Sequence, residues 1–250
     1  MAVIAPILTE LQALNPIFSK YQLDEPIKAN IEGDRKIAAI NISAKNLQIA
    51  YDPDKPVFKK PLNFTINDGQ KIAVDGESGS GKSTLLKILA GRLTDYTGEL
   101  ELDNTEYKNI ANSTLRANIV YIDQTAYLFN DTVRYNLELG QHFTAEEIKS
   151  ALEKADLWDF VSSLPQKLDT PVGEGGASLS GGQKQRLALA RGLLRKRKLF
   201  LLDESTSSLD KAGAIKVEND FLAQPEITVV FVSHQLHEEN KDKFDQIITV

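Results

Sequence analysis

The stretch that decides the fold is Gly76-Glu77-Ser78-Gly79-Ser80-Gly81-Lys82-Ser83. It fits the pattern G-x-x-x-x-G-K-[ST], a loop whose backbone N–H groups cradle phosphates. Lys71-Ile72-Ala73-Val74 before it reads as a short strand, and residues 83–93 after it carry the apolar spacing of a helix. Strand, glycine loop and helix in this order are the context that a phosphate loop requires, so the sequence predicts a nucleotide-binding α/β fold.

The chemistry of such a loop follows from its residue types. Successive backbone N–H groups and the positive end of the following helix converge on the phosphates. Lys82 adds a positive charge near the β- and γ-phosphates, and the Ser83 hydroxyl can ligate Mg²⁺. The predicted cofactors are therefore ATP and Mg²⁺. The predicted phosphate-binding residues are Gly76, Ser78, Gly79, Ser80, Gly81, Lys82, Ser83 and Thr84.

A second stretch, residues 198–204, is an apolar strand that ends in the carboxylates of Asp203 and Glu204. Ionised acids at the end of a buried strand are costly unless something offsets their charge. A bound Mg²⁺–nucleotide does so; the alternative is that both acids are simply solvated at a strand end.

A third stretch is Leu179-Ser180-Gly181-Gly182-Gln183, which opens a helical pattern with Leu187, Ala190 and Leu194. A hydroxyl, glycines and a helix N-terminus make a second anion site. Within one subunit this site has no ligand of its own unless another subunit's nucleotide fills it.

Together, the phosphate loop and this LSGGQ run resemble the nucleotide-binding domain of ATP-binding cassette (ABC) transporters. The resemblance implies that two domains pack head to tail, with each ATP between one phosphate loop and the partner's Ser180, Gly181, Gly182 and Gln183. It further implies that Asp203 helps to hold Mg²⁺ and that Glu204 is the general base, a role that needs reach and a tuned pKa.

Four further positions match the family pattern. By resemblance, Tyr51 stacks on adenine, Gln124 senses Mg²⁺ and the attacking water, and Asp210 belongs to a loop that crosses the dimer. His234 ends an apolar strand where the family places a histidine on the γ-phosphate. For Tyr51 the alternative is an ordinary surface tyrosine at a strand end.

The segments 170–176 and 124–133 resemble those of ABC exporters, which face a membrane domain. The resemblance covers residues 40–250. We therefore expect residues 1–38 to be a linker from a transmembrane domain that is missing from this chain, and residues 39–250 to be the ATP-binding domain. Its C-terminus is expected to be truncated, since relatives continue beyond the strand at 246–250. The implied partners are the protein's own transmembrane domain and a second nucleotide-binding domain, identical or different, at the cytoplasmic face of the cell membrane.

The expected fold is α/β, with a mainly parallel sheet, an N-terminal antiparallel β subdomain and an inserted α-helical subdomain at about 125–195. Alternating apolar residues between 40 and 66 predict the antiparallel strands. Thr144 and Glu147 form a capping-box pattern that opens a helix, and Trp158 is expected in the core.

Composition narrows the alternatives. The content of 42% hydrophobic and 26% charged residues is that of an ordinary globular protein. The net charge of −6 disfavours nucleic-acid binding, and the absence of cysteine excludes disulfides and thiolate metal sites. No apolar run reaches the roughly 18 residues of a membrane helix. The first ten residues lack basic residues and contain Pro6, which argues against a secretory signal, so the chain reads as cytoplasmic.

Two other classes stay open. A nucleotide-gated clamp of the DNA-repair type would carry long coiled coils between the motifs, and here the gap is a short helical region. A degenerate site that binds ATP without hydrolysis is disfavoured by the intact Lys82, Asp203, Glu204 and His234. A GTPase is disfavoured because no N-K-x-D motif is present. The transported substrate is not encoded in these motifs.

Some positions depart from the family pattern. Asp75 stands where an aliphatic residue is usual and is expected to weaken nucleotide affinity, while Gln235 and Arg197 replace other common residues. His142 and His237 are expected to face solvent, and residues 195–198 to form a solvated turn between helix and strand.

Overall fold

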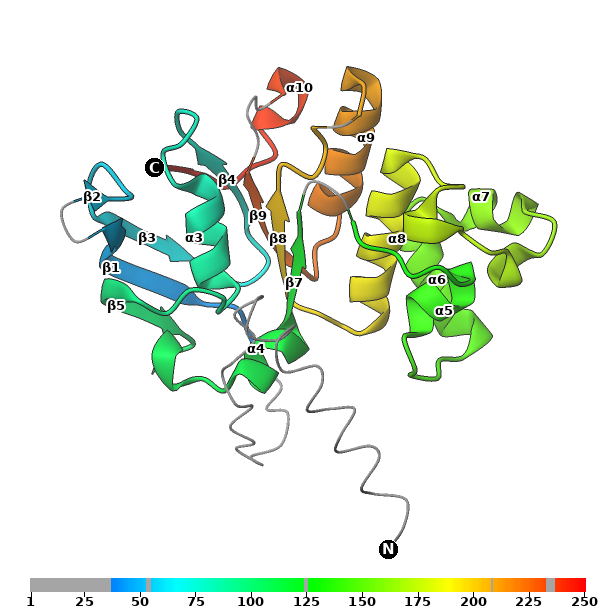
Figure 1. Cartoon of the computed structure of the whole chain (residues 1–250), viewed down its shortest axis with the longest axis horizontal. Coiled ribbons are helices and arrows are strands. Elements are labelled where there is room, and N and C mark those ends of the chain that lie inside the picture. The colour runs from blue at the N-terminus through cyan, green and yellow to red at the C-terminus, as the bar shows by residue number, and fades with distance from the viewer. Residues whose placement is uncertain (1–36, 53–54, 124–125, 208, 233–236) are drawn as a thin grey trace, which may run out of the picture. The chain divides into compact units, whose positions relative to one another are not determined.

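Two β-sheets and a set of helices make up the described part of the chain in a computed structural model (Figure 1). The structure describes residues 37–52, 55–123, 126–207, 209–232 and 237–250. All of them belong to one unit, Asp34–Val250.

The antiparallel sheet is built around its longest strand, β1. β1 pairs with β2, β3 and β5, and β5 pairs with β6. In β3, Leu62, Phe64 and Ile66 are buried while the residues between them are exposed, the period of two that places one face of a strand on a core. The strand bounds are β1 Ile42–Asp52, β2 Lys55–Pro56, β3 Leu62–Ile66, β5 Tyr96–Leu102 and β6 Thr105–Glu106.

The second sheet is wholly parallel, in the order β10-β4-β9-β8-β7. Every residue of β8 and β9 is buried, because both faces of a parallel sheet are covered. The expected α/β fold with two unlike sheets is confirmed. The strand bounds are β4 Lys71–Asp75, β7 Ile119–Ile122, β8 Leu199–Asp203, β9 Thr228–Val232 and β10 Gln246–Thr249.

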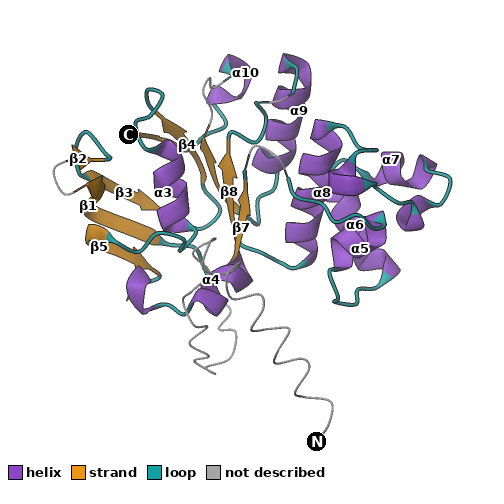
Figure 2. Ribbon diagram, in the orientation of Figure 1, coloured by secondary structure: helices purple, strands orange, loops and turns teal. Residues whose placement is uncertain are grey.

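Helices cover both faces of the parallel sheet (Figure 2). α3 lies between the two sheets, whereas α8 packs beside β7 and contacts α5, α6 and α9. The helix bounds are α3 Lys82–Leu89, α4 Asn112–Asn118, α5 Val133–Glu138, α6 Ala145–Lys154, α7 Trp158–Ser163, α8 Gly181–Leu194, α9 Lys211–Leu222 and α10 Glu238–Lys241.

The helix after the phosphate loop ends earlier than residue 93, where the apolar spacing placed its end. Gly91 adopts a left-handed φ of 69° and its N–H donates to Ile88 O over 2.9 Å, while Arg92 N donates to Lys87 O over 2.9 Å. These two bonds form a Schellman motif, which ends a helix with a glycine. The spacing of apolar residues alone does not indicate where this helix ends.

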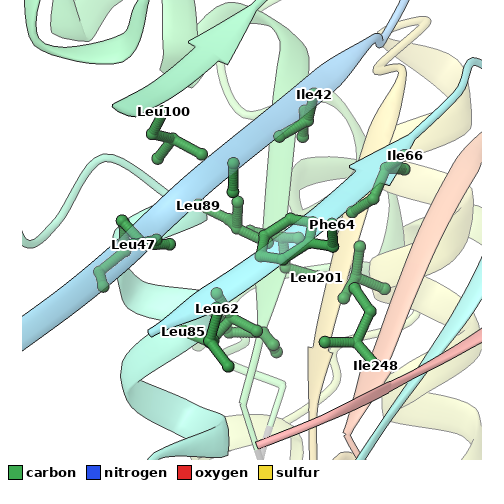
Figure 3. Packing of buried hydrophobic residues seen from close by; sticks show 14 of the residues in the cluster. Ile42, Leu47, Leu62, Phe64, Ile66, Leu85, Leu89, Leu100, Leu201 and Ile248 are labelled. Carbon is green, nitrogen blue, oxygen red and sulfur yellow. The ribbon is translucent and has the colours of Figure 1, made fainter. Parts of the chain in front are cut away.

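Two hydrophobic cores meet at the parallel sheet. One fills the space between the antiparallel sheet, α3 and one face of the parallel sheet, where Leu201 and Ile248 lie near Phe64 and Leu85 (Figure 3). The other joins the opposite face to α5, α6, α8 and α9 and contains Phe200. Consecutive residues of β8 thus belong to different cores, which fixes the register of the strand.

The helical region between β7 and β8 contains the expected capping box. Glu147 N donates to Thr144 Oγ1 over 3.2 Å, and Thr144 N donates to Glu147 Oε2 over 2.9 Å. Trp158 packs against the second core as expected but is only partly buried. Among the described residues, no helix has the length and apolarity needed to cross a membrane.

The turn at residues 195–198 differs from the expected solvated turn. Only Lys196 is exposed. The Arg195 guanidinium donates to Leu137 O over 2.6 Å and to Glu138 O, so it caps the C-terminal end of α5. A long cationic side chain satisfies the last carbonyls of a neighbouring helix, a contact that adjacency in sequence cannot predict.

Candidate functional site

The carboxyl ends of the parallel strands lie along one edge of the sheet. Strand register places Val74 of β4 opposite Val232 of β9, and Val232 opposite Asp203 of β8. Ile122 of β7 pairs with Leu202. The residues that follow these strands therefore gather at one edge, the usual ligand-binding position of an open α/β sheet.

The phosphate loop runs from β4 into the N-terminus of α3. Lys82 is 5% exposed, and its Nζ donates to Gly76 O over 2.7 Å and to Glu77 O over 2.9 Å. Gly81 precedes the helix with φ 102°, and a Cβ there would lie 2.6 Å from Val57 Cγ1 and 2.9 Å from Phe58 Cε1. Only glycine fits this position without displacing its neighbours.

The loop fits a phosphate chain on two observations. Ser80 is 6% exposed, and its buried Oγ has no hydrogen-bond partner among the described residues. The first backbone bond of α3 is Leu85 N to Gly81 O, so the N–H groups of the preceding helical residues have no acceptor within the helix. Buried donors of this kind are the normal partners of a bound anion.

Two of the residues predicted to bind Mg²⁺ are 120 positions apart in the sequence but are hydrogen-bonded to each other. Ser83 Oγ donates to Asp203 Oδ1 over 2.8 Å, and Asp203 is 8% exposed. Mg²⁺ is usually bound through one or two carboxylates together with substrate phosphates, so this small oxygen set fits the ion.

The other oxygen of Asp203 has a partner that the motifs did not indicate. Tyr121, on β7, donates its hydroxyl to Asp203 Oδ2 over 2.5 Å. Burial is the main cause that raises the pKa of the Tyr121 hydroxyl, and the hydrogen bond to Asp203 raises it further. The hydroxyl therefore stays protonated and able to donate at neutral pH. A tyrosine within the otherwise aliphatic run 119–122 was the only sequence signal for this contact.

Glu204 leaves the strand in an uncommon conformation. Its φ is 49°, in the left-handed region, and its N–H donates to Val232 O over 3.0 Å. The side chain is half-buried, next to Asp203. Non-glycine residues hold such a conformation only where their surroundings impose it, and these cases cluster at functional sites.

The signature run forms the cap of α8. Gln183 N donates to Ser180 Oγ over 3.3 Å, and Ser180 N donates to Gln183 Oε1 over 2.8 Å, a complete capping box. One turn further, Arg186 Nε lies 2.6 Å from Asp220 Oδ2 of α9. The pair is mostly buried and holds the capped end of α8 against α9.

The remaining predicted residues are placed as follows. Tyr51 is 68% exposed, and its hydroxyl lies 3.5 Å from Thr84 Oγ1, beside the phosphate loop. Asp210 caps α9 by accepting from Gly213 N over 3.0 Å. Gln124 and His234 lie outside the described residues, as does Gln235.

Asp75 is exposed at the end of β4. Its Oδ1 accepts a hydrogen bond from Gly76 N over 2.8 Å. The carboxylate thus occupies one backbone donor at the very start of the phosphate loop.

His142 is exposed as expected, but the expectation for His237 is wrong. The His237 side chain is 18% exposed, and its Nδ1 lies 2.9 Å from Glu218 Oε1. Glu218 lies on α9, whose helical pattern gave no indication that it carries a buried acid that binds a histidine.

The chain is similar in sequence and in fold to known proteins. The family model described as "ABC transporter" matches residues 59–207. The ATP-dependent lipid A-core flippase of Photobacterium profundum is 38% identical over 223 residues, covering 87% of this chain and 38% of the flippase. The ABC multidrug transporter atrC of Emericella nidulans is 38% identical over 220 residues, covering 80% of this chain and 17% of atrC.

The fold is also found among solved structures. A bacterial Atm1-family ABC exporter with ATP bound superposes with a TM-score of 0.76 and 29% identity, covering 96% of this chain and 43% of the exporter. The chain thus spans less than half the length of each of these relatives. On its motifs, its fold and these matches, the chain belongs to the ABC transporter family, as an ATP-binding domain related to exporter-type transporters.

Proposed function

We propose that this chain binds and hydrolyses ATP in a head-to-tail dimer and thereby drives export through a transmembrane domain. The observation that carries the proposal is the contact of Ser83 with Asp203 beneath the phosphate loop. It joins the phosphate-binding helix to the acidic strand end in the arrangement that a Mg²⁺–nucleotide needs.

Each residue has a distinct role in this proposal. Lys82 leaves its two loop carbonyls and binds the β- and γ-phosphates, and Tyr51 stacks on the adenine. Glu204 accepts the proton of the attacking water, while Gln124 and His234 orient the water and the γ-phosphate. Mg²⁺, when bound by Ser83, Asp203 and Gln124, neutralises the phosphate charge.

The second half of the site comes from the partner domain. Ser180 caps α8, and its helix N-terminus, with Gly181 and Gly182, presents partial positive charge to an anion. The signature run belongs to the helical region and the phosphate loop to the sheet edge, so a second copy in head-to-tail orientation completes both sites. Asp210, exposed at the cap of α9, lies at this dimer interface in the proposal.

An exposed aromatic cluster supports a membrane-domain partner. Tyr127, Phe129 and Tyr135 are 70%, 40% and 44% exposed, and their rings meet edge to face at 5.1 and 5.9 Å. Large aromatic side chains gathered on a surface mark protein interfaces. In the proposal, residues 39–250 are the ATP-binding domain at the cytoplasmic face of the cell membrane, and residues 1–38 link it to that membrane domain.

The test is ATP-dependent dimerisation of the Glu204→Gln variant, measured by light scattering with and without Mg-ATP, beside phosphate release by the wild-type chain. We expect a stable dimer only with Mg-ATP and only when Gln replaces Glu204, because ATP then persists at the interface. Adding Ser180→Arg to this variant should abolish the dimer while leaving ATP binding to the monomer intact.

The control is Glu238→Gln, the same chemical change at a side chain that is 81% exposed on α10. It should behave as wild type. Wild-type ATP binding without phosphate release would instead support a regulatory ATP-binding domain. A Glu204→Gln dimer that survives Ser180→Arg would contradict the head-to-tail arrangement.

A further inference from the structure

The Asp203 carboxylate is held from two sides. Oδ1 accepts from Ser83 Oγ over 2.8 Å, and Oδ2 accepts from the Tyr121 hydroxyl over 2.5 Å. Asp203 ends β8 and Tyr121 lies on the neighbouring strand β7, where it pairs with Leu201. Strand register therefore sets the separation of the two side chains, and both oxygens of a buried carboxylate have a fixed donor.

The tyrosine ring is itself held in place. The guanidinium carbon of Arg92 lies 4.1 Å from the centre of the Tyr121 ring, a cation–π contact. Tyr121 and Arg92 also both line a groove of about 350 Å³. Arg92 covers the ring while the hydroxyl binds Asp203, so the hydroxyl has little freedom to swing away from Oδ2.

We propose that Tyr121 is a positioning residue for Mg²⁺–nucleotide binding, which fixes Asp203 with Oδ1 directed at Ser83, Asp203 and Ser83 being the two residues that would hold the ion. This inference rests on the proposed nucleotide function. Groups that hydrogen-bond a metal-ligating carboxylate orient it and tune its affinity for the metal. With Oδ2 hydrogen-bonded to Tyr121 of β7, the carboxylate keeps Oδ1 directed at Ser83.

The matched variants are Tyr121→Phe, which removes only the hydroxyl, and Tyr121→Leu, which removes the ring as well. The control is Tyr96→Phe. Tyr96 Oη also donates to a carboxylate, that of Glu106 over 3.0 Å, but Tyr96 lies in the antiparallel sheet, whereas Asp203 ends a strand of the parallel sheet. Thermal unfolding followed by circular dichroism verifies that each variant of the 250-residue chain is folded.

The probe is mant-ATP, a fluorescent ATP analogue, titrated in EDTA and in increasing Mg²⁺. We expect Tyr121→Phe to raise the half-saturating Mg²⁺ concentration about tenfold, the low end of the effect of losing such a partner. Affinity in EDTA should equal that of the wild-type chain, because the hydroxyl acts only through Asp203. Tyr121→Leu should behave like Tyr121→Phe, and Tyr96→Phe like wild type.

Three results would overturn the inference. One is an unchanged Mg²⁺ requirement in Tyr121→Phe. Another is an equal loss of mant-ATP affinity with and without Mg²⁺, which indicates a general packing role. A third is a loss in Tyr121→Leu alone, which assigns the effect to the ring. Failure of the wild-type chain to bind mant-ATP in either buffer would refute the proposed function as well, whereas normal wild-type binding beside an unchanged Tyr121→Phe refutes this inference only.

Discussion

His237 Nδ1 lies 2.9 Å from Oε1 and 3.1 Å from Oε2 of Glu218, whose side chain is only 3% exposed. The same carboxylate accepts from Asn240 Nδ2 over 2.9 Å and from Thr206 Oγ1 over 3.4 Å. Glu218 lies on α9, Thr206 follows the acidic end of β8, and His237 directly precedes α10. One buried acid thus connects α9, α10 and the segment that follows β8.

Replacing Glu218 with Gln should lower the free energy of unfolding by about 2 kcal/mol, because hydrogen bonds to a charged group are each worth about 1.5–3 kcal/mol. The glutamine amide also turns a donor toward the donors of His237 or Asn240. The measurement is urea unfolding followed by circular dichroism. Glu238→Gln makes the same change on an exposed side chain and should stay within about 0.5 kcal/mol of wild type. Equal unfolding midpoints in the two variants would contradict a stabilising role for the network.

Replacing Gly81 with Ala should lower the free energy of unfolding by about 3 kcal/mol, since a left-handed backbone and a crowded Cβ both add cost. The new methyl group would lie 2.6 Å from Val57 Cγ1. Gly140→Ala is the matched control. Gly140 has φ 81°, and a Cβ added there would meet nothing within 4 Å. The Gly140→Ala variant therefore measures the cost of the left-handed backbone alone, about 1 kcal/mol of unfolding free energy. Urea unfolding of both variants measures the difference, and equal losses would show that the loop accommodates the methyl group.

Replacing Asp75 with Asn should strengthen ATP binding about threefold. The change removes a negative charge next to the phosphate loop but keeps an oxygen that accepts from Gly76 N. A charge interaction across water is worth at most about 1 kcal/mol at 4 Å and weakens with distance and salt, so the gain should shrink at high ionic strength. Mant-ATP titrations at two salt concentrations measure it. Asp95→Asn, beyond the C-terminal end of α3, is the control, and an equal gain there would rule out a local effect.

The ion pair of Lys59 with Glu77 gives a pH prediction. Lys59 Nζ lies 2.6 Å from Glu77 Oε2, and this hydrogen bond, followed by the lysine charge, lowers the pKa of Glu77 below its ordinary value of 4.5. Because the pKa of Glu77 is lowered in the folded state, the pair stabilises the fold at pH values above the ordinary pKa. That contribution is lost as the pH falls through the lowered pKa. Both side chains are largely exposed, so the effect is expected to be local and weakened by salt.

Lys59→Met should therefore raise the pKa of Glu77 toward its ordinary value, as followed by NMR titration of the side-chain carboxyl carbon. Lys60→Met removes the same charge one residue further along and should leave the Glu77 titration close to that of wild type. A Glu77 titration that is identical with and without Lys59 would mean that the pair does not persist in solution.

Most local features of the site were predictable because they depend on neighbouring residues. The phosphate loop, the capping box at Thr144, the helix start at Ser180 and the buried strand ending in Asp203 are each defined within a few residues. Their chemistry is set by backbone geometry and by side chains three positions apart. The family and the two-sheet α/β fold were predicted on this basis and are confirmed. The roles assigned to individual residues stay predictions, including those of Gln124 and His234.

Only the tertiary structure decided which residues far apart in the chain are in contact. Ser83 with Asp203, Tyr121 with Asp203, and Glu218 with His237 depend on strand register and on how α9 and α10 pack. The sequence by itself determined which segments form strands, loops and capped helices, because those preferences act between near neighbours. The pairing of side chains across elements follows from burying both faces of the parallel sheet. That burial requires all the elements of the chain to pack together, so no single segment can determine it.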